Sequence, residues 1–237
     1  MRSMLILAMF AASLGHAAFN EYEEVRDLKL DAAKLGKLSI EAGAGSLEIT
    51  GVAGLDAIVV TAIIQVPTAS PDKAQQVIES GLVLTLQQDG DEAVLKGYFN
   101  GGAWGRGDSP SVRLDVRVPA RLGLDVDDGS GSIVINGVSG DIQIEDGSGS
   151  ITMRAVGGSV GIEDGSGSIS VTGVGADLRI RDGSGSITVR QVGGSVIVDD
   201  GSGSINVSDV ERDLIIENAG SGGLNFSAIK GRVEQDG

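Results

Sequence analysis

The chain has 237 residues and a formal net charge of −15, with 33 acidic against 18 basic side chains and no cysteine. A surface of this charge repels nucleic-acid phosphates and anionic lipid, so neither is an expected partner. The only histidine is His16, so the remainder of the chain lacks the residues for Ser-His-Asp or Cys-His catalysis and for the usual zinc sites.

The opening segment MRSMLILAMFAASLGHA, residues 1–17, is typical of a secretory signal peptide. Arg2 gives the positive start, residues 4–14 the apolar run and residues 15–17 the small-residue cleavage site. The apolar run is too short to span a membrane, and no cysteine follows it for lipid attachment. We therefore expect an exported protein, soluble in the periplasm or outside the cell, with a single domain over residues 18–237.

The first part of this domain mixes strand-like and irregular segments. AGAGSLEITGVAG at 42–54 is a degenerate copy of a repeat that recurs further along, and an alternating run follows at 58–66. Ser-Pro-Asp at 70–72 predicts the start of a short helix that ends near Ser80, because serine caps helices and proline fits their first turn. We expect this helix to cap the open end of the core.

A hairpin and a glycine-rich loop follow the helix. The segment LVLTLQQDGDEAVLKGYF predicts two strands joined by a tight turn at Asp89-Gly90. The loop NGGAWGRGDSPS then leads into a strand over Val112–Val118, which Pro119 ends because proline cannot donate to a β-ladder. Residues 65–111 are therefore predicted to form a helix, hairpin and loop elaboration near the N-terminal end of the domain.

One motif governs the rest of the chain. DGSGSI at 128–133 recurs at 146, 164, 182 and 200, always eighteen residues on, and each copy holds two short alternating runs. Alternation marks half-buried strands, and equivalent residues of successive copies would stack at about 4.8 Å. This indicates an all-β fold, a single-stranded β-solenoid with 18-residue coils of two nine-residue halves, with regular repeats over 128–217.

Three columns of apolar residues are predicted to face inward. They are Ile133, Ile151, Ile169, Ile187 and Ile205; Val138, Val156, Val174, Val192 and Val210; and Ile144, Ile162, Ile180, Val198 and Ile216. Gly131 and its equivalents lie where a Cβ would crowd a tight corner. The sixth copy begins with Asn218 in place of aspartate and has one extra residue, so residues 218–237 are expected to be a terminal coil that covers the core.

The order of these segments resembles a known family. The stretch SVRLDVRVPARLGLDVDDGSGSIVINGVSGDIQIEDGSGSI is a long strand, a proline and then Gly-Ser/Asp-Ile coils, as in the bacterial putative-adhesin family of exported β-strand-repeat proteins of unknown function. The resemblance covers most of residues 22–233. It implies a β-solenoid fold and a surface or periplasmic setting, and it brings no established catalytic residues.

The repeated aspartates raise the question of a cation site. They form a ladder of Asp128, Asp146, Asp164, Asp182 and Asp200, which suggests calcium because RTX-type β-rolls also use two nine-residue halves per turn. In that pattern the ligand lies two residues after the last glycine, a position that Ile169 and its equivalents occupy here. We therefore expect each aspartate to cap its own turn through backbone N–H groups, with no cofactor, and calcium remains the alternative.

The loop at 99–111 holds the candidate partner-binding residues Trp104, Arg106, Gly107 and Asp108. RGDSP at 106–110 matches a cell-attachment tripeptide, although a chain rich in these residues meets it easily by chance. Trp104 beside Arg106 could stack on a sugar ring, but a large aromatic is more often used to cover a core. Elsewhere, Arg154 and Arg190 are expected to pair with Asp141, Asp177 and Asp213 on adjacent coils.

Catalysis is not predicted for this chain. Acid and base roles need two carboxyls in different environments, whereas a ladder of equivalent aspartates offers identical ones. The sequence therefore favours a non-enzymatic exported β-solenoid that acts as a structural, adhesion or envelope-interaction module, with an envelope protein or glycan as the expected partner and no membrane insertion. The alternative is a carbohydrate-binding or carbohydrate-active solenoid that uses the 99–111 loop.

Overall fold

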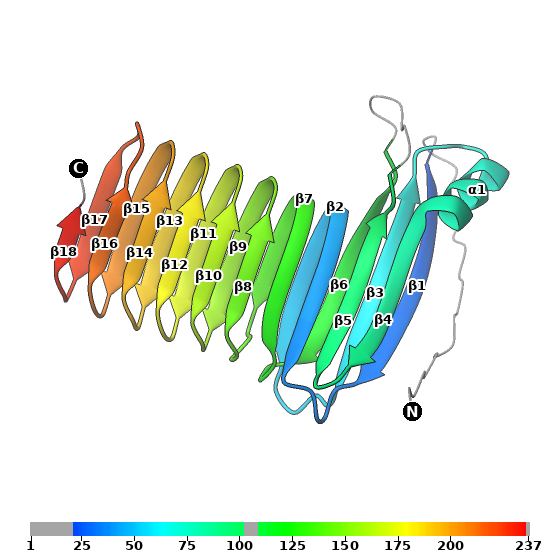
Figure 1. Cartoon of the computed structure of the whole chain (residues 1–237), viewed down its shortest axis with the longest axis horizontal. Coiled ribbons are helices and arrows are strands. Elements are labelled where there is room, and N and C mark those ends of the chain that lie inside the picture. The colour runs from blue at the N-terminus through cyan, green and yellow to red at the C-terminus, as the bar shows by residue number, and fades with distance from the viewer. Residues whose placement is uncertain (1–20, 102–108, 236–237) are drawn as a thin grey trace.

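The computed structural model describes residues 21–101 and 109–235, and the chain forms a β-solenoid of about six turns with coils of about 18 residues (Figure 1). The predicted fold class is thus confirmed. The proposed signal peptide at 1–17 and the loop residues Trp104, Arg106, Gly107 and Asp108 lie outside the described residues.

The N-terminal part combines parallel and antiparallel pairs. Its elements are β1 (Tyr22–Asp31), β2 (Lys37–Val52), β3 (Ala57–Val66), α1 (Pro71–Gly81), β4 (Leu82–Asp89), β5 (Glu92–Phe99) and β6 (Ser111–Pro119). β1 pairs with β3, β3 with β6 and β4 with β5, all antiparallel, whereas β2 runs parallel to both β5 and β6. β6 ends at Pro119, as predicted.

The degenerate early copy is a true coil of the solenoid. β2 runs parallel to β7 (Gly123–Asn136), with Ala42 opposite Asp128 and Leu47 opposite Ile133. The two segments are far apart in sequence, but their apolar residues alternate in the same phase. When the strands pair, the apolar side chains of both therefore point into the same core. Residues 57–119 therefore lie between these two coils in the sequence, although the coils are direct neighbours in space.

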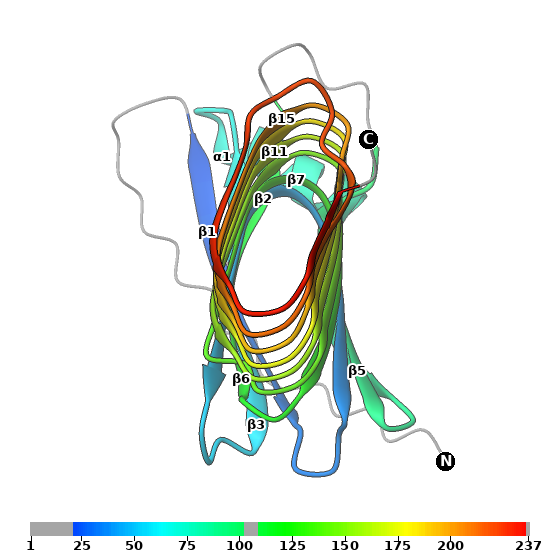
Figure 2. The same ribbon diagram turned by 90° about the vertical axis from the view of Figure 1, so that its left-hand side faces the viewer.

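The regular coils each contain one short and one long strand. The short strands are β8 (Ile142–Asp146), β10 (Val160–Asp164), β12 (Leu178–Asp182), β14 (Val196–Asp200) and β16 (Leu214–Asn218). The long ones are β9 (Gly149–Val156), β11 (Gly167–Val174), β13 (Gly185–Val192) and β15 (Gly203–Val210), followed by β17 (Leu224–Ile229) and β18 (Val233–Gln235). Neighbouring coils are parallel around one interior (Figure 2), and they stay in register up to β14 and β15. The strands of the two halves differ in length, with five and eight residues.

The interior is built from stacked apolar columns. The three predicted columns are confirmed, since all of their members are at most 2 % exposed. Two further columns are buried with them, namely Ile135, Met153, Val171, Val189 and Val207, and Ile142, Val160, Leu178, Val196 and Leu214. Each coil thus covers its neighbour's apolar face, which is the main source of stability in a repeat protein.

The glycines of the motif are required by the closeness of successive coils. Gly167 has φ +144°, and a Cβ built there would lie 1.5 Å from the carbonyl oxygen of Gly149. The same clash recurs with each equivalent glycine of the regular coils. The predicted crowding is confirmed, and its cause is the backbone of the preceding coil.

The predicted helix and hairpin are present at the N-terminal end. Ser70 caps α1 by accepting from the N–H of Lys73, and Ala74 and Ile78 pack in a small apolar cluster with Ile64. The helix therefore covers this cluster, while β1 and β4 contact each other across the end of the main core (Figure 1). The hairpin turns at Gly90-Asp91, one residue later than predicted, because Asp89 is itself paired with Glu92.

The terminal coil contains the predicted extra residue. The register between β14 and β16 shifts after Val198, so that Asp199 lies opposite Asn218. β17 then lies on β15 and covers Ile205, Val207 and Val210, which are at most 2 % exposed. Of its own inward side chains, Leu224 and Ile229 are partly buried, whereas Phe226 is 47 % exposed. The terminal coil thus covers the coil before it and leaves Phe226 exposed at the end of the core.

Candidate functional site

A column of buried aspartates lies at one corner of the solenoid. Asp128, Asp146, Asp164, Asp182 and Asp200 each end a short strand or its equivalent, and they are only 0 to 6 % exposed. Their burial follows from the strand alternation: Ile144 and Asp146 are two residues apart in β8, so both side chains face inward. The alternation visible in the sequence already indicates this burial, which the turn-capping and calcium hypotheses did not include.

In four of the five aspartates, one carboxylate oxygen accepts a hydrogen bond from the backbone of the turn. The N–H of Ser148 donates to Oδ1 of Asp146 over 3.1 Å, and the same bond recurs at Asp164, Asp182 and Asp200. In the terminal coil, Asn218 accepts from the N–H of Gly220 over 3.0 Å. The prediction that each aspartate caps its own turn is confirmed at these positions.

The other oxygen is unpartnered. Oδ2 of all five aspartates is buried without a hydrogen-bond partner, which is unfavourable for an ionised carboxylate. Burial raises the pKa of Asp128 to about 7 and that of Asp182 to about 6, and the charges of neighbouring aspartates in the column add to both rises. Burial is also the largest cause of the raised pKa values of Asp146, Asp164 and Asp200. The aspartates of the column therefore take up protons at a higher pH than ordinary aspartates do.

A row of exposed and half-buried charges runs beside the buried column. It consists of Asp127, Glu145, Glu163, Arg181 and Asp199, and together with the buried aspartates and the corner glycines it lines a groove of about 710 Å³. Four of these five side chains are acidic, and they repeat at the spacing of the coils. We call this surface the acidic groove. Sequence reasoning missed it, because it depends on the row next to the motif.

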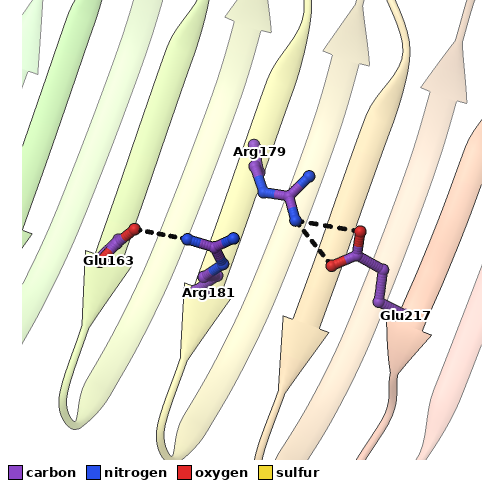
Figure 3. A network of polar contacts seen from close by, with 4 residues as sticks. All are labelled: Glu163, Arg179, Arg181 and Glu217. Carbon is purple, nitrogen blue, oxygen red and sulfur yellow. Dashed lines mark hydrogen bonds and ion pairs between the residues drawn. The ribbon is translucent and has the colours of Figure 1, made fainter.

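Two ion pairs cross the coils beside the acidic groove (Figure 3). Arg181 meets Glu163 on the adjacent coil at 2.8 Å, and Arg179 reaches Glu217 two coils away, also at 2.8 Å. All four side chains are more than one-third exposed, so each pair contributes at most about 1 kcal/mol.

The predicted pairing of Arg154 and Arg190 with aspartates is wrong. Within the described parts of the chain no ion pair involves either arginine. Asp141 and Asp177 instead accept the backbone N–H of Ser159 and Ser195 on the next coil, each over 2.8 Å. A short side chain takes the nearest donor, and here that donor belongs to the backbone. Asp213 does meet an arginine, but it is Arg232.

The described residues contain neither a metal-binding cluster nor a membrane-spanning helix. Across residues 21–101 and 109–235, no three acidic, histidine or cysteine side chains are grouped so that they could hold a metal ion. In the same residues, no helix is long and apolar enough to cross a membrane. Calcium binding at the aspartate column therefore remains a hypothesis without a preformed cage of ligands.

The comparisons with known proteins find similarity only among solved structures. No family model matches the chain, and no curated protein matches it. A putative adhesin from Bacteroides fragilis is 11 % identical, with a TM-score of 0.42 and coverage of 90 % of this chain and 97 % of that one. A putative cell adhesion protein from Clostridium sporogenes is 13 % identical, with a TM-score of 0.35 and coverage of 91 % and 100 %.

A third similar structure has a different description. A putative lipid binding protein from Parabacteroides distasonis is 15 % identical, with a TM-score of 0.42 and coverage of 91 % of this chain and 97 % of that one. The names of the two adhesins agree with the family resemblance seen in the sequence. At these TM-scores the likeness carries no argument about what this chain binds or does.

Proposed function

We propose that the chain is a non-enzymatic, exported β-solenoid that serves as a structural or adhesion module of the cell envelope, and that it meets a positively charged envelope protein or glycan along the acidic groove. The observation that carries the proposal is the repetition of the groove. Asp127, Glu145 and Glu163 present acidic groups on three successive coils, and Asp199 follows one coil beyond Arg181. Such a row suits an extended, multivalent contact, in which weak charge pairs add up.

The uniformity of the groove also argues against catalysis. All five buried aspartates have the same unpartnered oxygen, and four of them, from Asp146 to Asp200, share the same turn bond. A hydrolase needs one carboxyl to donate a proton while another acts as base or nucleophile, which requires two different environments. A repeated surface of one kind fits binding better than chemistry.

Binding of the mature full-length chain to purified envelope fragments tests this proposal. We expect retention at low salt and release at high salt, because the contact is electrostatic. The triple variant Asp127→Asn, Glu145→Gln and Glu163→Gln should bind about tenfold more weakly, at about 0.5 kcal/mol for each lost rim charge.

The matched control removes the same charge elsewhere. Asp72, Glu79 and Asp91 are exposed and lie in the N-terminal elaboration, away from the acidic groove. The variant Asp72→Asn, Glu79→Gln and Asp91→Asn should bind like the wild type. Equal binding by both triple variants would contradict the proposed surface, and release of sugars from an acidic polysaccharide would contradict the non-enzymatic role.

A further inference from the structure

The C-terminal end of the solenoid exposes a cross-section of its own core. Phe226 is 47 % and Val233 is 40 % exposed, and they are the only exposed large hydrophobic side chains in the described residues. Both lie in register with buried core residues of the preceding coil, Phe226 with Val207 and Val233 with Leu214. Figure 2, viewed from this end, shows the last coil as an open ring. Phe226 and Val233 therefore continue the stacked apolar columns of the core, and no further coil of the described chain covers them.

The same end has an unprotected strand edge. β17 pairs with β15 only, and no further strand of the described chain continues the sheet beyond it. Its sequence, LNFSAI, contains no charged residue and no proline. Natural edge strands usually carry such residues, because an uncharged edge with free N–H and C=O groups pairs with another strand. β17 thus lacks the charged residues and prolines that often prevent edge-to-edge association.

At the opposite end, one of the two edge strands is rich in charge. In β1, six of the ten residues are charged: Glu23, Glu24, Arg26, Asp27, Lys29 and Asp31. β4 contacts both β1 and α1, and the described part of this end exposes no large hydrophobic side chain. A head-to-tail contact would place the apolar end of one copy against this charged and covered end of the next. The two ends therefore do not fit each other.

Charge also favours contact between two C-terminal ends. The chain as a whole carries −15, so most of its surface repels a second copy. From Asn218 to Gln235 the only charged residues are Lys230, Arg232 and Glu234. Lys230 is paired with Glu211, and Arg232 with Asp213 and Glu234. The terminal coil is thus the place where two copies approach with the least repulsion.

We propose that the chain forms a closed, two-fold dimer through its C-terminal coil, in which β17 pairs antiparallel with β17 of a second copy. In an antiparallel pair, residues directly opposite each other point to the same face of the sheet. A register with Phe226 opposite its own equivalent therefore keeps both side chains inside and joins the two cores. Because the contact uses the same surface on both copies, it closes after two and does not propagate.

The oligomeric state of the mature full-length chain, measured by sedimentation at increasing concentration, tests this proposal. We expect a mass of two chains that does not grow further. The variant Phe226→Lys places a charge on the edge and should be monomeric. The matched control is Gln87→Lys on β4, an exposed position at the other end of the solenoid, and it should remain dimeric.

Hydrogen exchange gives a second readout in case Phe226→Lys disturbs folding. The amides of residues 224–229 should exchange slowly in the wild type and fast in Phe226→Lys, while exchange in β9 and β11 stays unchanged. Val233→Lys, on the neighbouring strand, should weaken the dimer in the same way. A monomeric wild type, a dimer that survives both lysine variants, or a mass that grows with concentration and falls in Gln87→Lys would each overturn the proposal.

Discussion

The regular coils and the early coil in β2 follow the same path but differ at one position. β2 runs alongside β7 with Ala42 where β7 has Asp128, and every later coil up to Asp200 keeps the aspartate. The terminal coil has Asn218 there, which still bonds a turn N–H. The corner can therefore be built without a buried carboxyl. The aspartate column is thus a feature of the regular coils alone, and it makes their stability depend on pH.

The largest effect is expected where the regular coils touch through their backbones. Gly167→Ala would force a Cβ to within 1.5 Å of the Gly149 carbonyl oxygen at φ +144°, so we expect a loss of more than about 4 kcal/mol, or failure to fold, in urea unfolding. The control is Gly54→Ala in the N-terminal part, where φ is +74° and no atom lies within 4 Å of the added Cβ. Its loss should be about 1–2 kcal/mol from backbone strain alone. Similar losses in both variants would show that the coils can move apart.

The next largest effect is expected from apolar side chains, which are more deeply buried in the regular coils than in the terminal coil. Ile169→Ala should lower the free energy of unfolding by about 2–5 kcal/mol, because the side chain is 1 % exposed between two coils. Leu224→Ala, at the equivalent position of the terminal coil, should lower it less, since that side chain is only partly buried. A loss below about 0.5 kcal/mol at Ile169 would contradict ladder packing.

The aspartate column should make the solenoid more stable in mild acid than at neutral pH. The raised folded-state pKa values mean that the folded protein binds protons more tightly than the unfolded one. This contribution is fully present below the unfolded pKa near 4 and is lost as pH rises through about 6 for Asp182 and about 7 for Asp128. Urea unfolding should therefore give a larger free energy at about pH 5 than at about pH 8.

Two variants separate the column from other carboxyls. Asp182→Asn keeps the acceptor for the turn, as Asn218 does, and should flatten part of the pH dependence and be neutral or slightly stabilising near pH 8. Asp72→Asn, at an exposed position of α1, should leave the pH dependence of the unfolding free energy unchanged. Added calcium should scarcely move the melting temperature of the wild type. A rise of several degrees with calcium that Asp182→Asn abolishes would make the column a metal site instead.

The smallest effect is expected at the surface of the coils. A double-mutant cycle with Glu163→Gln and Arg181→Gln should give a coupling of at most about 1 kcal/mol, since both side chains are at least half exposed. The coupling should shrink further at high salt. A coupling above about 2 kcal/mol, unchanged by salt, would mean that this pair is part of the core of the repeat.

Periodicity predicted the fold well, because an 18-residue repeat fixes which residues stack. Ile151, Ile169 and Ile187 are buried as a column for this reason. The pairing of β2 with β7 was harder to predict, since it bridges an insertion and depends on which distant strands find the same phase. The acidic groove was missed because it is formed by residues outside the repeated DGSGSI motif, such as Glu145. The stacking of the coils decides which of these residues lie side by side.

The regular coils are expected to be interchangeable units, each held by its two neighbours. Deletion of one complete copy, Asp164 to Arg181, brings Glu163 directly before Asp182 and should restore the same register one coil shorter. Circular dichroism and urea unfolding of this variant test the claim most directly. We predict that it keeps its β signal and unfolds cooperatively with modestly lower stability. Loss of the β signal would contradict the claim and indicate a fold that needs all of its coils at once.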